Sequence, residues 1–219
     1  AKLSKIVNMP LSLIDDFPGH PYHVRMDEDM DLLVDSVKKR GILVPVLVMP
    51  KDDGRYLMVS GHRRKKACEL AGLETIRAEV RELTMDEAIV EMVDSNLQRS
   101  SILPSEKAFA YKMKLDAMKR QGQRTDLTSA PVGQKLAASS RDTLANKSPD
   151  SSSQIQRYIR LTYLTPDLLE MVDNAAVKAP GTPQIALRPA VELSYLTEQE
   201  QIDLVETISY EDATPSLSQ

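Results

Sequence analysis

The sequence predicts an α+β domain over residues 1–98, followed by an all-helical domain over residues 99–219. In the first part, short runs of β-branched and apolar residues alternate with amphipathic segments of helical spacing. From Pro104 onward no segment has the pattern of a strand. With 219 residues and 42% hydrophobic content, the chain is long enough to form a core in each part.

The first predicted helix covers residues 27–41, DEDMDLLVDSVKKRG. Acidic side chains stand at its start and basic ones at its end, and Gly41 follows as a stop signal. The residues expected on its buried face are Met30, Leu33, Val34 and Val37.

A β-hairpin and a second helix are predicted next. The runs VPVLVMP and RYLMVS are separated by KDDG, in which Gly54 supplies the positive φ of a tight turn. A helix is then expected from about His62 to Ala71, with Gly72 just after its end.

The α+β pattern closes with a strand and a capped helix. The segment TIRAEVREL alternates as a strand. Thr84 and Glu87 then have the spacing of a capping box at the start of a helix. We expect this helix to end the first domain near residue 98.

The second domain is predicted to contain helices joined by polar loops. PSEKAFAYKMKLDAMKRQG has helical spacing, and the polar stretch QGQRTDLTSAP that follows predicts a loop. Further helices are expected at TPDLLEMVDN and over roughly residues 189–208, with a break at KAPGTPQ. In the helix PSEKAFAYKMKLDAMKRQG, the residues expected on the inner face are Ala108, Tyr111, Leu115 and Met118.

Within this domain, RDTLANKSPDSSSQIQRYIRL predicts a helix-turn-helix at about residues 140–161. Leu144 and Ala145 lie in its first helix, and a second helix begins near Ser151 after a short polar turn. Ser, Gln and Arg are residue types that read base edges and bind phosphates, although a helical hairpin with a polar outer face has the same pattern. The side chains expected to meet DNA are Ser151, Ser152, Ser153, Gln154, Gln156, Arg157 and Arg160.

The charge distribution favours a nucleic-acid partner for this segment. The whole chain has a net charge of −4, but residues 99–160 carry 12 basic and 5 acidic side chains, a net charge of +7. Residues 161–219 carry a net charge of −8. Because phosphate backbones attract a local excess of positive charge, we expect Arg160 and the lysines of residues 107–119 to contact DNA phosphates.

Several classes of protein are disfavoured by composition. The single cysteine, Cys68, forms no internal disulfide, and the three histidines do not have zinc-site spacing. The longest apolar runs are too short to span a bilayer, and the N-terminus lacks a signal-peptide pattern. We therefore expect a cytoplasmic protein with no structural metal and no membrane partner. The chain begins at Ala1, which suggests a fragment of a longer protein.

The stretch SGHRRKKA has the features of a phosphate-binding site. A glycine between a strand and a helix allows close approach of the backbone, and the helix N-terminus and arginines favour an anion. The spacing matches neither the Walker A loop nor GxGxxG, and a basic solvent-exposed helix face is the alternative interpretation.

Four segments in order resemble the ParB family of chromosome and plasmid partition proteins and their nucleoid-occlusion relatives. They are HPYHVR, SGHRRKKACELAG, DSNLQRSSILPSEKAFAY and SSSQIQRYIRLTYLTPDLLEMV. The resemblance implies a ParB/sulfiredoxin-like N-terminal domain that binds CTP with Mg²⁺, and a helix-turn-helix that binds a palindromic site in double-stranded DNA. It also implies a homodimer, a partner ATPase and a nucleoid-associated protein.

Carried over to this sequence, the resemblance implies a nucleotide site made of three motifs. The residues at these motifs are Arg25, then Gly61, His62, Arg63 and Arg64, and finally Asn96 and Arg99. Two family glutamates associated with magnesium and hydrolysis are absent, because His62 stands in the GERR motif and Ser95 in the ENxxR motif. We therefore expect weak or absent hydrolysis unless Asp94 substitutes. Pro149 also replaces the usual glycine of the helix-turn-helix turn.

Other functions remain as alternatives. A transcriptional regulator or adaptor with a degenerate nucleotide site has the same domain order. A sulfiredoxin needs a cysteine where Gly61 stands, and a kinase needs a carboxylate near SGHRRKKA. A metal-dependent nuclease needs clustered carboxylates, which are here spread along helix exteriors.

Overall fold

The computed structural model describes residues 5–99, 101–126, 144, 148–211 and 213–215. The chain forms two compact units, residues 1–95 and 96–219, each with its own core.

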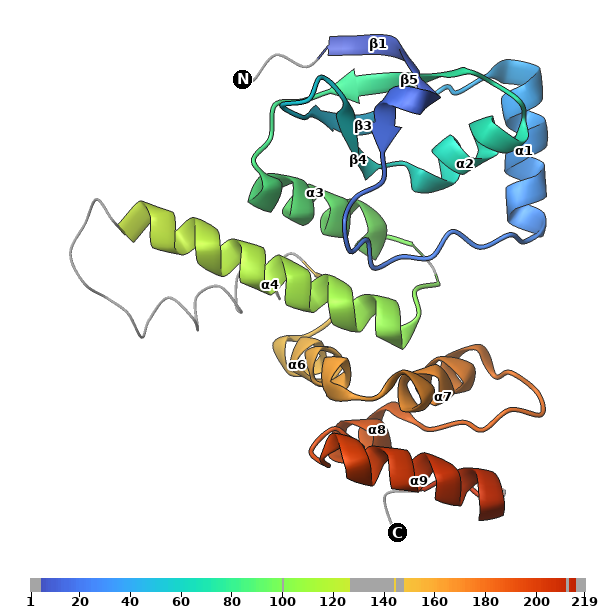
Figure 1. Ribbon diagram of the computed structural model, residues 1–219, viewed down its shortest axis with the longest axis vertical. Helices are drawn as coiled ribbons and strands as arrows, with labels where there is room; N and C mark the ends of the chain where they lie inside the picture. The colour runs from blue at the N-terminus through green and yellow to red at the C-terminus, as the bar shows by residue number, and fades with distance from the viewer. Residues whose placement is uncertain (1–4, 100, 127–143, 145–147, 212, 216–219) are drawn as a thin grey trace. The chain divides into compact units, whose positions relative to one another are not determined.

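The first unit is built on a five-stranded mixed sheet (Figure 1). Its strands are β1 (Lys5–Pro10), β2 (Ile14–Asp15), β3 (Val46–Pro50), β4 (Tyr56–Ser60) and β5 (Thr75–Val80), in the spatial order β1-β5-β3-β4-β2. The pairs β1/β5 and β3/β4 are antiparallel, and the pairs β3/β5 and β2/β4 are parallel. The strands β3, β4 and β5 and the hairpin turn at Gly54 (φ 78°) were predicted from the sequence, whereas β1 and β2 were not.

Three helices accompany the sheet, and each begins or ends where the sequence indicates. In α1 (Glu28–Arg40), the Asp27 side chain accepts a hydrogen bond from the Met30 amide at 3.0 Å, and Gly41 follows with φ 67°. The second helix, α2, covers His62–Leu70. In α3 (Met85–Leu97), Thr84 and Glu87 form the predicted capping box, with bonds of 2.7 and 3.3 Å.

The core of the first unit joins α1 and α2 to the sheet. Burying each large aliphatic side chain contributes roughly 1.5–3 kcal/mol. The buried members are Met9, Ile14, Met30, Val34, Val37, Val46, Val48, Met58, Ala67, Cys68, Ile76 and Ala78.

In the described residues, the second unit is helical. Its elements are α4 (Pro104–Asp126), α6 (Ser152–Arg160), a 3-10 turn (Leu161–Tyr163), α7 (Pro166–Val177), α8 (Leu187–Leu193) and α9 (Glu198–Glu211). The prediction of a loop from residue 121 was wrong, because α4 continues through Asp126. Gln and Arg are good helix formers, and one internal glycine costs only about 1 kcal/mol.

The first helix predicted for the helix-turn-helix lies almost entirely outside the described residues. Leu144 is the exception, and it is helical and buried. The helices predicted after the recognition segment are confirmed as α7, α8 and α9, and they enclose a core of Leu161, Leu164, Leu168, Met171, Val172, Ile185, Ala190 and Ile208. Among the helices in the described part of the chain, none has both the length and the apolar character needed to cross a membrane.

Candidate nucleotide site and nucleic-acid interface

Gly61 connects β4 to α2 in a conformation that only glycine adopts without strain. Its φ is +110°, and a Cβ atom placed there lies 2.6 Å from Val46 Cγ1, inside van der Waals contact. Val46 is fully buried in β3. The backbone at the start of α2 is therefore held close to the sheet by the absence of a side chain.

The first turn of α2 presents backbone N–H groups. The Gly61 carbonyl accepts bonds from the Arg64 amide at 2.8 Å and the Lys65 amide at 3.0 Å. The amides of His62 and Arg63 precede these and occupy the N-terminal end of the helix, where the helix dipole favours an anion. This end of α2 can accept a phosphate group.

Arg63 is partly exposed beside this helix end. Its Nη2 lies 3.2 Å from Asp27 Oδ1, and the Arg63 side chain is 28% exposed. The Arg63 contact therefore brings the loop before α1 next to α2. Arg25 is half-buried in that loop, and its Cα is within roughly 7 Å of that of Asp27, two residues along the chain.

Arg64 has a structural role that the sequence did not indicate. The sequence assigned both arginines to the phosphate site, but Arg64 Nη1 donates to the carbonyl oxygens of Val44 at 2.6 Å and Pro45 at 2.7 Å. Burial lowers the pKa of the Arg64 guanidinium from its ordinary value. The correction has a simple cause: the carbonyl groups entering β3 need donors, and the Arg64 guanidinium provides them.

The side chain of His62 is directed into the protein. It is only 8% exposed, and its ring centroid lies 3.7 Å from that of His20, with the two planes tilted by 35°. The Nδ1 atom of His20 is 2.8 Å from the Tyr22 carbonyl oxygen. His62 therefore offers its backbone N–H at the helix end while its imidazole packs on His20, a residue that we did not select from the sequence.

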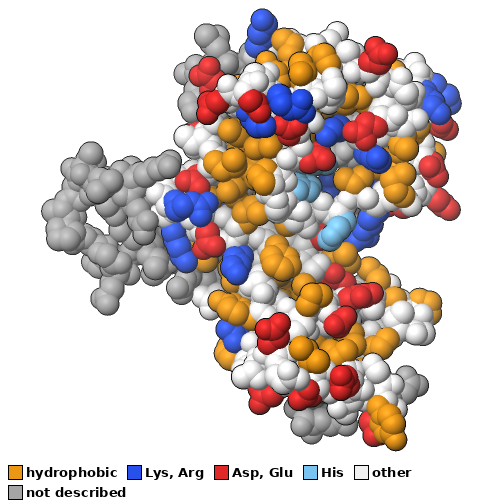
Figure 2. All heavy atoms as spheres, viewed as in Figure 1, with side chains coloured by type: hydrophobic (Ala, Val, Ile, Leu, Met, Phe, Trp, Pro, Cys, Tyr) orange, Lys and Arg blue, Asp and Glu red, His pale blue; other side chains and the backbone are white. Residues whose placement is uncertain are grey.

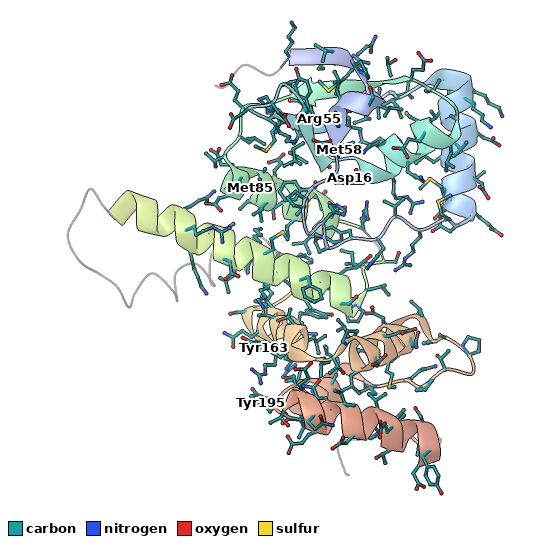
Figure 3. All side chains as sticks on the ribbon, in the orientation of Figure 1. Asp16, Arg55, Met58, Met85, Tyr163 and Tyr195 are labelled. Atoms are coloured by element: carbon teal, nitrogen blue, oxygen red, sulfur yellow. The ribbon has the colours of Figure 1, made fainter. Side chains whose placement is uncertain are left out.

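The two lysines of SGHRRKKA are paired with acids. Lys65 Nζ lies 2.6 Å from Asp16 Oδ1, and Lys66 Nζ lies 3.2 Å from Glu69 Oε2. Asp16, labelled in Figure 3, is on the segment that follows β2, so its pair with Lys65 ties α2 to the sheet edge. Much of the positive charge in this stretch is locally neutralised.

The third nucleotide motif lies at the end of α3, within the second unit. The Arg99 amide donates to the Asn96 carbonyl at 3.0 Å, and the Asn96 side chain is buried while Arg99 is exposed. Ser95 Oγ donates to the Met92 carbonyl at 2.9 Å and is thus occupied within its own helix. The participation of Asn96 and Arg99 in the phosphate site stays a prediction.

The helix predicted to meet DNA is present as α6. Ser151 caps it, accepting a bond from the Gln154 amide at 3.3 Å, and Ile155 is buried on its inner side. Arg157 Nη1 donates to Gln154 Oε1 at 3.4 Å. Of the seven side chains predicted to meet DNA, the exposed ones are Ser151, Ser153, Gln156 and Arg157, and the half-buried ones are Ser152, Gln154 and Arg160.

The turn before α6 is fixed to α4 through Asp150. Its Oδ2 accepts bonds from Lys107 Nζ at 2.9 Å and from the Tyr111 hydroxyl at 2.7 Å. The Lys107 ammonium also lies 4.9 Å from the centroid of the Tyr158 ring. Lys107, which we expected to bind DNA phosphates, instead holds this turn in place.

The other lysines of α4 differ in exposure. Lys112 and Lys119 are exposed, whereas Lys114 is only 1% exposed. Lys114 therefore cannot reach a DNA phosphate without movement of the helix.

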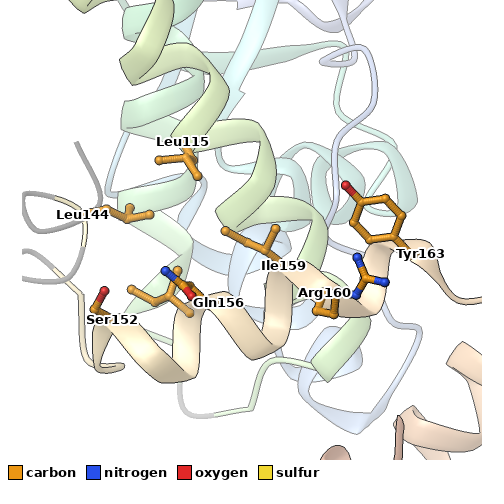
Figure 4. Close-up of a pocket in the computed structure, with 8 residues that line it drawn as sticks. Leu115, Leu144, Ser152, Gln156, Ile159, Arg160 and Tyr163 are labelled. Atoms are coloured by element: carbon orange, nitrogen blue, oxygen red, sulfur yellow. The ribbon is translucent and has the colours of Figure 1, made fainter. Parts of the chain in front are cut away.

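A pocket of about 240 Å³ lies beside α6 and reaches its exposed side at Gln156 (Figure 4). It is closed at one end by Arg160 and Tyr163, whose side chains stack. The remaining lining residues are Leu115, Leu144, Ser152, Ile155, Gln156 and Ile159.

Comparison with known proteins identifies the first domain and relatives of the chain. Residues 1–97 match the ParB N-terminal domain family. The chain is 32% identical over 174 residues to the chromosome-partitioning protein Spo0J of Thermus thermophilus, covering 80% of this chain and 57% of that protein. It is 35% identical over 114 residues to the chromosome-partitioning protein ParB of Caulobacter vibrioides, covering 51% of this chain and 37% of that protein. The chain thus spans about half the length of these relatives or less.

Among solved structures, the C-terminally truncated ParB of Caulobacter crescentus, complexed to the centromeric parS site, resembles this chain in fold. The TM-score is 0.51 and the identity 21%, over 95% of this chain and 94% of that chain. The predicted α+β fold of the N-terminal domain is confirmed by the sheet and by the domain match. Residues 1–97 belong to the ParB N-terminal domain family, and the chain is similar to ParB proteins over most of its length.

Proposed function

We propose that this chain is a sequence-specific DNA-binding protein that acts in chromosome or plasmid partition, with α6 as its recognition helix. The observation that carries the proposal is the outer face of α6. That face exposes Ser153, Gln156 and Arg157 within a segment of net charge +7. A capped helix after a fixed turn, with such side chains outward, has the properties of a helix that enters the major groove.

The side chains on α6 suit direct contact with bases. Arg forms bidentate bonds with guanine, and Gln does so with adenine. The bond between Arg157 and Gln154 limits the rotation of both side chains and so favours one pattern of contacts. Because one helix-turn-helix reads one half-site, we infer that two copies bind a palindrome.

Titration of duplex DNA at several salt concentrations tests this proposal. We expect affinity to fall steeply as salt rises, because bound phosphates release counterions. Changing Gln154 and Arg157 together to alanine should cost about 1–3 kcal/mol per base-reading side chain and relax sequence preference. The matched control is Gln199→Ala with Arg188→Ala, which removes the same residue types from exposed positions on α9 and α8. Salt-independent binding, or equal affinity for the α6 variant and the control, contradicts the role of α6.

We propose further that the N-terminal end of α2 binds the phosphates of a nucleotide, with CTP as the expected ligand from family membership. The His62 and Arg63 amides and the Arg63 guanidinium fit a phosphate group there, and Gly61 lets the start of α2 pack directly against Val46. Bound CTP would supply a charged triphosphate, whose oxygens could hold Mg²⁺ in the site. The described residues include no cluster of three or more His, Cys, Asp or Glu side chains suited to a metal, and Mg²⁺ in nucleotide sites is commonly held largely by phosphates and water.

In this proposal Arg63 changes partner when a nucleotide binds. Its pair with Asp27 competes with the phosphate, so removing the carboxylate charge should strengthen binding. Asp27→Asn keeps an N-cap residue for α1, because Asn caps helices as well as Asp does. Calorimetry with CTP, ATP and GTP should show tighter CTP binding for Asp27→Asn and loss of binding for Arg63→Ala. Equal CTP affinity in the wild type and both variants contradicts the phosphate assignment.

We expect little hydrolysis of the nucleotide. The imidazole of His62 packs on His20, and the Ser95 hydroxyl is bonded within α3, so neither side chain is available to activate water. Measured release of phosphate from CTP, with and without DNA, tests this expectation. Turnover that disappears in Asp94→Asn would assign the missing carboxylate role to Asp94.

A further inference from the structure

We propose that Arg160 positions the recognition helix and thereby sets its sequence discrimination, and that Arg160 does not bind a DNA phosphate. The inference rests on the proposed function of α6. It replaces the expectation from sequence, in which the charge and outward position of Arg160 suggested a phosphate contact.

The guanidinium of Arg160 is used within the protein. Its Nε donates to Ser194 Oγ at 2.8 Å, and its Nη2 donates to the Ser194 carbonyl oxygen at 2.7 Å. Ser194 is the C-cap of α8 and is only 3% exposed. Carbonyl groups at a helix C-terminus lack partners within the helix and are stabilised by a cation. Arg160 therefore joins the end of α6 to the end of α8.

Two tyrosine rings pack against the same guanidinium. Arg160 Cζ lies 3.9 Å from the ring centroid of Tyr195 and 4.5 Å from that of Tyr163. Figure 3 labels both tyrosines, and Figure 4 shows the stack of Arg160 on Tyr163. Cation–π contacts of this kind restrict a planar guanidinium to one orientation. A phosphate would have to break these contacts before it could bind Arg160 in the usual two-pronged manner.

A second tie fixes the chain just beyond α6. Gln201 of α9 is 2% exposed; its Oε1 accepts a bond from the Thr165 amide at 2.8 Å, and its Nε2 donates to the carbonyls of Tyr163 at 3.1 Å and Leu196 at 3.2 Å. The end of α6 is thus held by α8 through Arg160 and by α9 through Gln201.

The helix geometry connects this anchor to base recognition. Gln156 lies four residues before Arg160 and therefore on the same side of α6, one turn away. Specific contacts tolerate a displacement of only about 0.5 Å. Loss of the Arg160 anchor should consequently disturb the contacts that distinguish bases, while the exposed charges that attract any DNA remain in place.

The experiment compares two DNA probes. One is a duplex that the wild-type protein selects from a random library, and the other is a scrambled duplex of the same composition. Affinities for both are measured at several salt concentrations for the wild type, Arg160→Lys, Arg160→Ala and Tyr195→Ala. Lys keeps the charge of Arg160 but not its planar fork, and Tyr195→Ala leaves the charge untouched.

We expect all three variants to lose discrimination between the two duplexes, by roughly tenfold. Affinity for the scrambled duplex and the slope of log K against log salt should stay as in the wild type. A phosphate contact predicts a different outcome: Arg160→Ala weakens both duplexes alike and lowers the slope by about 0.9, and Arg160→Lys restores binding. That outcome overturns the inference, as does a lower melting temperature with unchanged discrimination.

Two further outcomes can be told apart from those above. If Arg160→Ala does not fold, Arg160→Lys and Tyr195→Ala still decide between the two roles. If the wild-type protein selects no sequence from the library, the proposed function of α6 fails, and the inference about Arg160 fails with it.

Discussion

Arg63 and Arg64 are adjacent in sequence but use their guanidinium groups in different ways. Arg63 pairs with a partly exposed carboxylate and can exchange it for another anion. Arg64 donates to two backbone carbonyls at the entry to β3. A ligand can thus recruit the first arginine without loss of structure, whereas recruiting the second would leave two carbonyl groups without their donor.

Arg64→Ala should therefore destabilise the protein, whereas Arg63→Ala should not. We expect a loss of about 2 kcal/mol in the free energy of unfolding for Arg64→Ala, since hydrogen bonds from a charged donor contribute roughly 1.5–3 kcal/mol. Arg63→Ala should change it by less than about 0.5 kcal/mol, as an exposed pair contributes little. Urea denaturation of both variants measures the difference. Equal stability of the two would show that the Val44 and Pro45 carbonyls do not depend on Arg64.

Asp15 confers a pH dependence on the edge of the sheet. Its carboxylate accepts bonds from the Arg55 guanidinium and from Lys51 Nζ, the latter at 2.6 Å, and joins β2 to the β3–β4 hairpin. Hydrogen bonds from Arg55, then from Lys51, hold the pKa of Asp15 well below its ordinary value of 3.8. A carboxyl group whose folded pKa is lowered adds stability above its ordinary pKa and loses it as the pH falls.

We therefore expect a stability difference between the wild type and Asp15→Asn at neutral pH that shrinks as the pH falls below about 3.8. Thermal unfolding of both proteins from pH 7 to pH 2 measures it. Asp52→Asn, in the same hairpin loop, serves as a control. A constant difference across this range would exclude an ionised Asp15 as the source.

At the scale of elements, the junction of β4 and α2 depends on one side chain of β3. The missing Cβ of Gly61 leaves space that Val46 fills, and the Arg64 Nη2 lies 3.2 Å from the same point. The packing of strand β3 against the β4–α2 turn and helix α2 thus depends on Gly61.

Gly61→Ala should destabilise the protein by more than the roughly 0.4–1 kcal/mol typical of Gly and Ala exchanges, because it adds both a steric clash and an unfavourable positive φ. Val46→Ala relieves only the clash. The loss of unfolding free energy in the double variant should therefore be smaller than the sum of the losses in the two single variants. A double-mutant cycle of unfolding free energies gives this coupling. Additive effects would mean that the φ angle alone accounts for the cost.

The elements predicted from sequence are those that carry local signals. Gly54 marks the hairpin, Thr84 with Glu87 marks a helix start, and Ser151 marks another. Strand β1 has no such signal, because Met9 is its only fully buried residue and its partner β5 lies far along the chain. The role of Arg64 was missed for the same reason: its acceptors are 19 and 20 residues away.

At the scale of the whole molecule, the chain consists of two units with separate cores and different charges. Figure 2 shows acidic side chains over the C-terminal helices, in keeping with the net charge of −8 in residues 161–219. The positive charge is concentrated in residues 99–160. Affinity for DNA should accordingly belong to the second unit.

Separate expression of the two units tests this division. We expect a fragment of residues 1–99 to unfold cooperatively and to bind no duplex DNA, because it has its own core and carries 17 acidic against 15 basic side chains. A fragment of residues 96–215 should retain salt-dependent DNA binding. Circular dichroism and DNA titration of both fragments check these outcomes, and DNA binding by the first fragment alone would contradict the assignment.

The packing around Gly61 also bears on how this family is identified in genomes. Selection for folding alone retains Gly61 and Arg64, since one avoids a collision with Val46 and the other satisfies two carbonyls. A descendant that no longer used a nucleotide would still keep half of the signature. Arg63 is not required for folding in this way, so under the proposed nucleotide role a change at position 63 should be the first sequence sign of a lineage that no longer binds the nucleotide.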